Sequence, residues 1–264
     1  MWRDLILAPS GARGETPPPS LARILNSLFA LLVLISVVWV CLASLHLDWM
    51  SVWNFRVMLF KGWLMTMGVT AAALVLSTAM GFVLALFQRS YVLPVRYLAR
   101  FFVEVLRCIP LLALIYLIWY GFEGAFGIGN EYRLISGILI LTLFESAYIS
   151  EIMRAGIESV GKTQIESARA IGFTRTQTYR YVIIPQAFRQ VLPPLVGQLV
   201  SLIKDSSLLS VIAIAEFTQS AQQASSINYD NLETYFALAV GYLVLTVPIS
   251  LWSRWLERRF KYET

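Results

Sequence analysis

The residue pattern with the most direct chemical meaning runs from Gly156 to Thr163. It matches G-x-x-x-x-G-K-[ST], the phosphate-binding loop of nucleotide hydrolases. That loop binds phosphate because a strand delivers it and a helix follows, so backbone N–H groups point at the ligand. Here the preceding residues, 134–152, predict a membrane helix, and Glu158 would put a carboxylate inside the loop. We therefore interpret the match as accidental and expect no ATP or Mg²⁺ on this chain. We also expect no metal site, because suitable ligands are not grouped.

Two capping patterns occur in the same region. Residues 163–166 read T-x-x-E and residues 174–177 read T-x-x-Q, and each pattern predicts the start of a short helix. Gly172 is placed to end the first helix in a left-handed conformation, and the second should stop before Pro185. The segment is thus either an ordinary ordered loop or a protruding element on which a partner docks.

Charged residues inside apolar stretches are a second source of chemistry, because charges in a membrane tend to face a bundle interior or an aqueous cavity. Glu104 and Arg107 are three residues apart and share a helix face, so we interpret them as a structural ion pair. Glu145 has no nearby partner in the sequence before Glu151 and is a candidate for a translocation pathway.

A further charged pair, Lys204-Asp205, precedes Ser206 and follows a short apolar stretch that contains Pro193-Pro194. Interrupted helices commonly mark transporter binding sites, and an amino acid carries both charges. The pair could therefore meet the carboxylate and ammonium groups of a solute. It could equally be a mutual ion pair that fixes a break in the helix.

The elements that must position these residues are membrane helices. Hydrophobic residues make up 58% of the 264 residues and charged residues only 14%, against about 25% charge in soluble domains. Three stretches without charge, 24–45, 62–88 and 234–253, reach the roughly 20 residues needed to cross a bilayer. Three less regular stretches, 101–121, 134–150 and 190–203, raise the count to six. The fold class is therefore all-α, a polytopic transmembrane bundle.

The distribution of Lys and Arg predicts the orientation of these spans. Sixteen basic residues fall in the termini and in the loops near 89–100 and 152–189, whereas three fall in the opposite loops. Both termini and the capped loop are therefore predicted to be cytoplasmic. The net charge of +5 needs no nucleic-acid partner, because a basic face against anionic lipid explains it.

With these residues in view, the chain resembles a known family. Residues 166–185 read E-S-A-x3-G-x9-V-x-I-P, which is similar to the cytoplasmic E-A-A loop, E-A-A-x3-G-x9-I-x-L-P, of bacterial ABC importer permeases. Further runs resemble its polar amino-acid uptake branch, at 107–112, 147–154, 185–194 and 204–208. The resemblance covers roughly residues 63–260. Ser167 departs from the family alanine, and residues 161–164 replace the usual P-K-G-Q.

The resemblance implies a division of labour and a domain order. Residues 1–22 would be a cytoplasmic lead-in, 23–60 an extra span with an external loop, and 61–260 the permease domain with a coupling loop at about 155–187. Such permeases form homo- or heterodimers, dock on cytoplasmic ABC ATPase subunits that hold ATP and Mg²⁺, and receive solute from a periplasmic or lipid-anchored binding protein. The coupling contact would comprise Glu166, Ser167, Ala168, Gly172 and Pro185.

Two alternatives belong to other classes. A proton- or sodium-coupled secondary transporter could also use Glu145 and Lys204, although the two halves of the chain show no internal repeat. A membrane enzyme would need a nucleophile or a metal cluster. We expect a bacterial inner-membrane transport subunit for polar amino acids of the glutamate, glutamine, aspartate or basic class, and not an enzyme.

Overall fold

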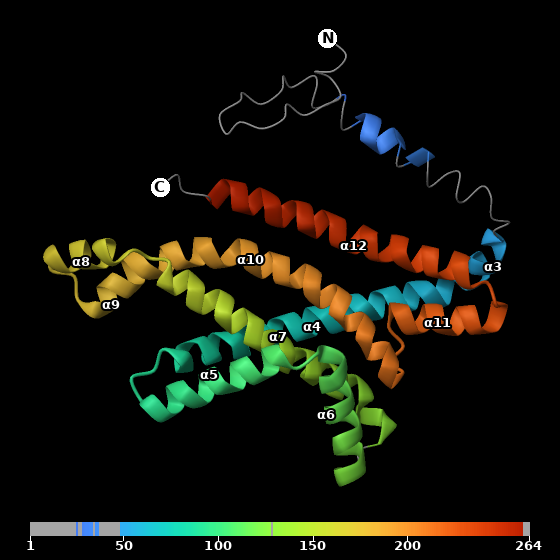
Figure 1. Ribbon diagram of the computed structural model, residues 1–264, viewed down its shortest axis with the longest axis horizontal. Helices are drawn as coiled ribbons and strands as arrows, with labels where there is room; N and C mark the ends of the chain where they lie inside the picture. The colour runs from blue at the N-terminus through green and yellow to red at the C-terminus, as the bar shows by residue number, and fades with distance from the viewer. Residues whose placement is uncertain (1–24, 26–27, 34, 37–47, 128, 261–264) are drawn as a thin grey trace. The chain divides into compact units, whose positions relative to one another are not determined.

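The computed structural model describes residues 25, 28–33, 35–36, 48–127 and 129–260. The predicted lead-in and most of the predicted first span lie outside these residues. The chain divides into two units, Met1–Trp49 and Met50–Thr264. The regular elements among the described residues of the second unit are all helical (Figure 1). They are α3 (Trp49–Asn54), α4 (Arg56–Gln88), α5 (Leu93–Cys108), α6 (Leu111–Phe126), η1 (Asn130–Tyr132), α7 (Arg133–Glu158), α8 (Lys162–Ala170), α9 (Arg175–Thr178), η2 (Tyr179–Ile183), α10 (Ile184–Asp205), η3 (Ser206–Ile212), α11 (Phe217–Asn228) and α12 (Asn231–Phe260).

Four helical segments of the described residues are long and apolar enough to cross a membrane. They are 56–88, 130–158, 175–212 and 231–260. The pair α5 and α6 passes the same test only when its two helices are taken together, and they meet at an angle of 105°. The described residues therefore hold four or five spans, in agreement with the last five of the six predicted.

The predicted span over 101–121 is a bent pair of helices, because Pro110 lies in its middle. A proline disfavours the helical conformation in the residue before it. Ile109 is accordingly extended, with φ −86° and ψ 129°, and α5 ends there. The helix that contains Glu104 and Arg107 also begins earlier than predicted, at Leu93, so both charges lie in its last turns rather than near its start.

The two prolines at 193 and 194, which suggested an interrupted helix, do not interrupt it. Helix α10 runs without interruption from Ile184 to Asp205 with both prolines inside it, and the geometry changes to a 3₁₀-helix only at Ser206. Membrane helices tolerate proline where neighbouring groups bond to the freed backbone. The carbonyls that lose their helical donor are those four residues before each proline, at Arg189 and Gln190. The Ser253 hydroxyl of α12 instead donates a hydrogen bond of 3.0 Å to the Pro193 carbonyl, which ties α12 to α10 beside the prolines.

Helices α4 and α7 cross at the centre of the bundle, while α12 packs along α10 (Figure 1). Small residues bring the central pair together: a Cβ on Gly81 would lie 2.8 Å from the Ile149 side chain. A Cβ on Gly62 would lie 2.3 Å from the Ser220 hydroxyl, so α11 also sits directly on α4. The outer face of α12 exposes large apolar side chains, as expected for a helix that faces lipid or another membrane chain.

Candidate functional site

The segment between α7 and α10 holds two short helices, α8 and α9, as predicted, but the prediction that the second stops before Pro185 is wrong, because α9 continues through η2 into α10. Helix α8 ends at Ala170, and Gly172, directly after the C-cap residue Ile171, has a φ of +89° in the left-handed region. The Gly172 N–H donates to the Arg169 carbonyl at 2.9 Å, and the Phe173 N–H donates to the Ala168 carbonyl at 3.0 Å. These two bonds make a complete Schellman motif, so the prediction for Gly172 is confirmed.

Only one of the two predicted capping boxes forms. The Gln177 N–H donates to the Thr174 hydroxyl at 3.3 Å, and the Thr174 N–H donates to the Gln177 side chain at 2.8 Å. The first box is wrong, because α8 starts one residue before Thr163, at Lys162, with Gly161 as its N-cap and no side-chain cap. Thr163 therefore lies inside the helix, where its hydroxyl cannot cap the first turn.

The predicted coupling residues divide between the surface and the interior of this loop. Glu166 and Ser167 are exposed, and Pro185 is exposed in the first turn of α10. Ala168 is buried, because α8 packs on α9 and η2. Ile171 is 74% exposed at the end of α8, which leaves an apolar side chain projecting next to the charged ones.

The phosphate-loop pattern has a structural explanation in helix packing. Residues 156–158 belong to α7. The pattern is therefore preceded by a helix, whereas a nucleotide-binding loop follows a strand. A Cβ on Gly156 would lie 2.2 Å from Val191, so this glycine allows α7 and α10 to approach. Glu158 bonds to Arg154, on the same helix, at 2.7 Å. The two glycines of the pattern therefore serve packing and the start of α8.

Glu145 lies in the interior of the bundle, on α7, and is fully buried. One carboxylate oxygen accepts a hydrogen bond of 2.6 Å from the Gln198 amide of α10. The other oxygen is buried, and no N–H or hydroxyl group among the described residues donates to it. A buried carboxylate oxygen without a partner is costly, and such an oxygen is able to accept a bond from a cationic group of a ligand.

The three residues predicted beside Glu145 have different environments. The Asp205 carboxyl lies next to that of Glu145, where the two groups repel each other when both are charged and share a hydrogen bond when one is protonated. Lys204 is exposed, and no salt bridge to it is found in the described part of the chain. Ser206 is buried, and its hydroxyl donates to the Ile203 carbonyl at 2.7 Å. The fold thus brings Asp205 to Glu145, 60 positions earlier in the sequence, but leaves Ser206 engaged with its own backbone.

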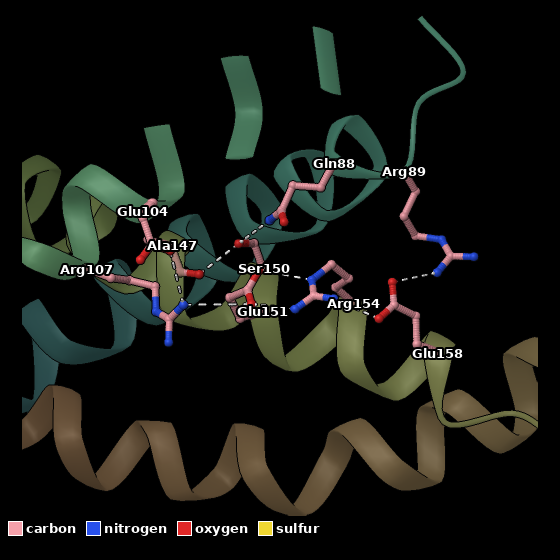
Figure 2. Close-up of polar contacts among 9 residues, drawn as sticks. All are labelled: Gln88, Arg89, Glu104, Arg107, Ala147, Ser150, Glu151, Arg154 and Glu158. Carbon is pink, nitrogen blue, oxygen red and sulfur yellow. Dashed lines mark hydrogen bonds and ion pairs between the residues drawn. The ribbon is translucent and has the colours of Figure 1, made fainter. Parts of the chain in front are cut away.

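A chain of ion pairs connects α4, α7 and α5 (Figure 2). Arg89, just after α4, lies 3.3 Å from Glu158. On α7, Arg154 lies 2.7 Å from Glu158 and 2.7 Å from Glu151. Arg107 of α5 follows, with its guanidinium 3.8 Å from Glu151 and over the Tyr148 ring. These contacts fix the ends of three helices relative to one another.

The predicted pair of Glu104 and Arg107 is the loosest link in this chain. Their side chains are 3.9 Å apart, the Glu104 side chain is 70% exposed, and Arg107 lies slightly nearer to Glu151. Exposed pairs of this kind typically contribute about 0–1 kcal/mol. The connection from α5 to α7 through Arg107 is therefore the more consequential of the two contacts.

One buried polar centre was missed at the sequence level. Glu216 is fully buried and caps α11 by accepting hydrogen bonds from the N–H groups of Thr218 and Gln219 at 2.9 and 2.7 Å. The hydroxyls of Thr66 and Tyr242 also donate to it, at 3.3 and 3.1 Å. Burial raises the pKa of the Glu216 carboxyl, although these four bonds oppose the shift. An acidic residue directly before a helix is the sequence signal that identifies such a cap.

Comparison with known proteins places this arrangement in context. Residues 77–262 match the family model described as "Binding-protein-dependent transport system inner membrane component". The chain is 36% identical over 208 residues to the "Probable glutamine ABC transporter permease protein GlnM" of Bacillus subtilis (strain 168), covering 79% of this chain and 95% of the relative. It is 35% identical to the "Glutamate/aspartate import permease protein GltK" of Escherichia coli O157:H7, covering 80% of this chain and 97% of the relative.

A solved structure described as an amino acid ABC transporter with histidines is also similar. It superposes with a TM-score of 0.77 at 34% identity, covering 81% of this chain and all of that one. The methionine transporter MetNI, in an inward-facing conformation, superposes with a TM-score of 0.64 at 19% identity and covers 78% of this chain. At that identity the second likeness concerns the fold alone.

Proposed function

This chain belongs to the family of binding-protein-dependent transport system inner membrane components, and we propose that it is the permease subunit of an ATP-driven importer of polar amino acids. Relatives named for glutamine and for glutamate/aspartate, each nearly covered by this chain, support the solute class. The solute would cross by alternating access, with both chain termini in the cytoplasm. ATP and Mg²⁺ would be held by a separate ATPase subunit.

The observation that carries this proposal is the geometry of the loop between α7 and α10. It is ordered by its own capping bonds, through Gly172 and Thr174, rather than by burial against the bundle. Its surface presents Glu166 beside the 74%-exposed Ile171. An exposed apolar side chain ringed by polar groups is the composition of a protein interface. The partner on this face would be the ATPase.

The solute path is proposed to pass Glu145 and Asp205. Glu145 offers a buried carboxylate oxygen to which no N–H or hydroxyl group among the described residues donates, inside the membrane-spanning bundle, and Asp205 places a second carboxylate beside it. An α-ammonium group would supply the missing donor. Lys204, the exposed residue directly before Asp205, would meet the α-carboxylate. A second permease chain and a periplasmic or lipid-anchored binding protein would complete the assembly.

Reconstitution into lipid vesicles tests the proposal. The chain is purified with its ATPase and binding protein, and uptake of each of the common amino acids is measured with and without ATP on the ATPase side. Uptake that requires ATP and the binding protein, and that continues after the proton and sodium gradients are collapsed, is expected. Uptake that depends on the proton or sodium gradient and does not require ATP would establish a secondary transporter instead.

A further inference from the structure

A cavity of about 310 Å³ opens beside the ion-pair chain, away from Glu145. It lies between the last turn of α4, the middle of α5 and the last turns of α7. Its lining holds two guanidinium groups, two carboxylates, one amide and one apolar side chain: Arg100, Arg154, Glu104, Glu151, Gln88 and Val103. This volume falls at the small end of the range for ligand sites.

The α7 side of this cavity is a wall whose charges are already paired (Figure 2). Arg154 holds Glu151 through two hydrogen bonds, of 3.1 and 2.7 Å, and holds Glu158 through a third of 2.7 Å. The Gln88 amide donates to the Ser150 hydroxyl at 3.1 Å. Because these groups fix each other, the wall is pre-formed and needs no ligand to order it.

The α5 side of the cavity carries charges that are not paired as closely as those on α7. Arg100 makes no hydrogen bond or ion pair with any part of the chain that the structure describes. Glu104, one helical turn further along the same face, is 70% exposed and has only long contacts, one of 3.9 Å to Arg107 and a hydrogen bond of 4.0 Å from the Cys108 thiol. One positive and one negative group are therefore available side by side in a hollow at the ends of α4 and α7.

We propose that this cavity is a second amino-acid site, in which Arg100 binds the α-carboxylate and Glu104 the α-ammonium group of solute that has already crossed the membrane. This inference rests on the proposed function. The four charged groups of the lining sum to zero, so the cavity favours neither a cation nor an anion but a molecule that carries both charges. The bound solute links α5 to the α7 side of the cavity and thereby slows the next transport cycle.

The site lies where the product of transport accumulates. Arg89 and Arg154, at the ends of α4 and α7, belong to loops predicted to be cytoplasmic from their basic residues. Solute at high concentration inside the cell thus has access to the cavity. Product inhibition by a solute site on the permease itself follows from this placement.

The test uses the complete complex in phosphatidylcholine vesicles, with the amino acid that it transports preloaded on the ATP side at increasing concentrations. Initial uptake in the wild type is expected to fall as the internal concentration rises. The amide of that amino acid, which lacks the carboxylate, and its N-acetyl form, which lacks the ammonium group, should not inhibit. Each variant's rate is divided by its own rate without internal solute, so that changes in basal activity do not interfere.

Replacing Arg100→Gln or Glu104→Gln is expected to raise the half-inhibitory concentration about tenfold, the loss typical of one charge-assisted hydrogen bond. Arg100→Lys should retain most of the inhibition. Arg254→Gln and Glu257→Gln, which change charge by the same amounts on α12, serve as controls and should leave it unaltered. Both control residues lie outside the cavity.

Three outcomes would overturn the inference while leaving the importer intact. Uptake in the wild type that ignores internal solute is the first, and inhibition that survives both Gln substitutions is the second. The third is a rate that responds to replacing phosphatidylcholine by phosphatidylethanolamine only while Arg100 is present, which would identify a lipid headgroup site. A wild-type complex that takes up no amino acid with ATP would instead refute the proposed function.

Discussion

Replacement of Gly172 should damage the coupling loop through its backbone alone. No atom lies within 4 Å of a Cβ built on this residue, so a small side chain meets no steric obstacle within the chain. Its φ of +89°, however, is a conformation that costs a residue with a Cβ about 1–2 kcal/mol. That amount reduces the population of the capped loop roughly 5- to 30-fold relative to its open forms.

The neighbouring Gly161 supplies a matched control. It lies at the other end of α8 with φ −58° and also has no atom within 4 Å of a built Cβ. Serine suits this N-cap position, so Gly161→Ser should leave the loop unchanged or slightly more stable. Gly172→Ser should lower both the amount of ATPase that co-purifies and the solute moved per ATP hydrolysed. Insertion in the membrane should not change.

A third variant separates the backbone effect from contact with the partner. Gly172→Trp adds bulk that projects away from the chain, toward the space that a docked ATPase would occupy. It should therefore abolish ATP-dependent uptake, a larger loss than Gly172→Ser produces. Equal behaviour of the two serine variants would refute the argument from φ, and normal uptake by the tryptophan variant would refute the docking role.

Three further predictions use pairs or single substitutions elsewhere. Gly62→Ala should lower the free energy of unfolding by about 1–3 kcal/mol, because the new Cβ would overlap a serine of α11. Gly68→Ala, where the new Cβ meets open space, should be neutral or stabilising, and thermal unfolding in detergent measures both. Thr174→Ala should remove about 1 kcal/mol from its cap and speed hydrogen exchange in α9, while Thr163→Ala, which caps nothing, should not. Lys204→Met should weaken solute affinity about tenfold in uptake assays, and unchanged affinity would exclude it from the pathway.

The sequence predicted the number and type of elements well, because apolar length alone decides where a chain crosses a bilayer. The sequence-based prediction was wrong where two similar local patterns adopt different structures because their surroundings in the fold differ. The T-x-x-E and T-x-x-Q patterns look equivalent, yet α8 begins before Thr163 and only Thr174 caps a helix. Likewise Pro110 follows the end of one helix, whereas Pro193 and Pro194 lie inside another, and no local pattern in the sequence separates the two cases.

The same limit applies to the contacts of the candidate site residues. Spacing in the sequence identifies partners three or four residues apart, and so it paired Glu104 with Arg107. In the folded chain Arg107 lies 3.8 Å from Glu151 and 3.9 Å from Glu104, and this bond between helices is invisible to any local pattern.

Glu216 is a stronger case, since the Thr66 hydroxyl that bonds to it lies 150 positions earlier in the sequence. Charged and polar residues inside a membrane bundle can be recognised from the sequence as costly and therefore purposeful. Their partners, and hence whether each one binds solute or holds helices together, follow only from packing between helices that are distant in the chain.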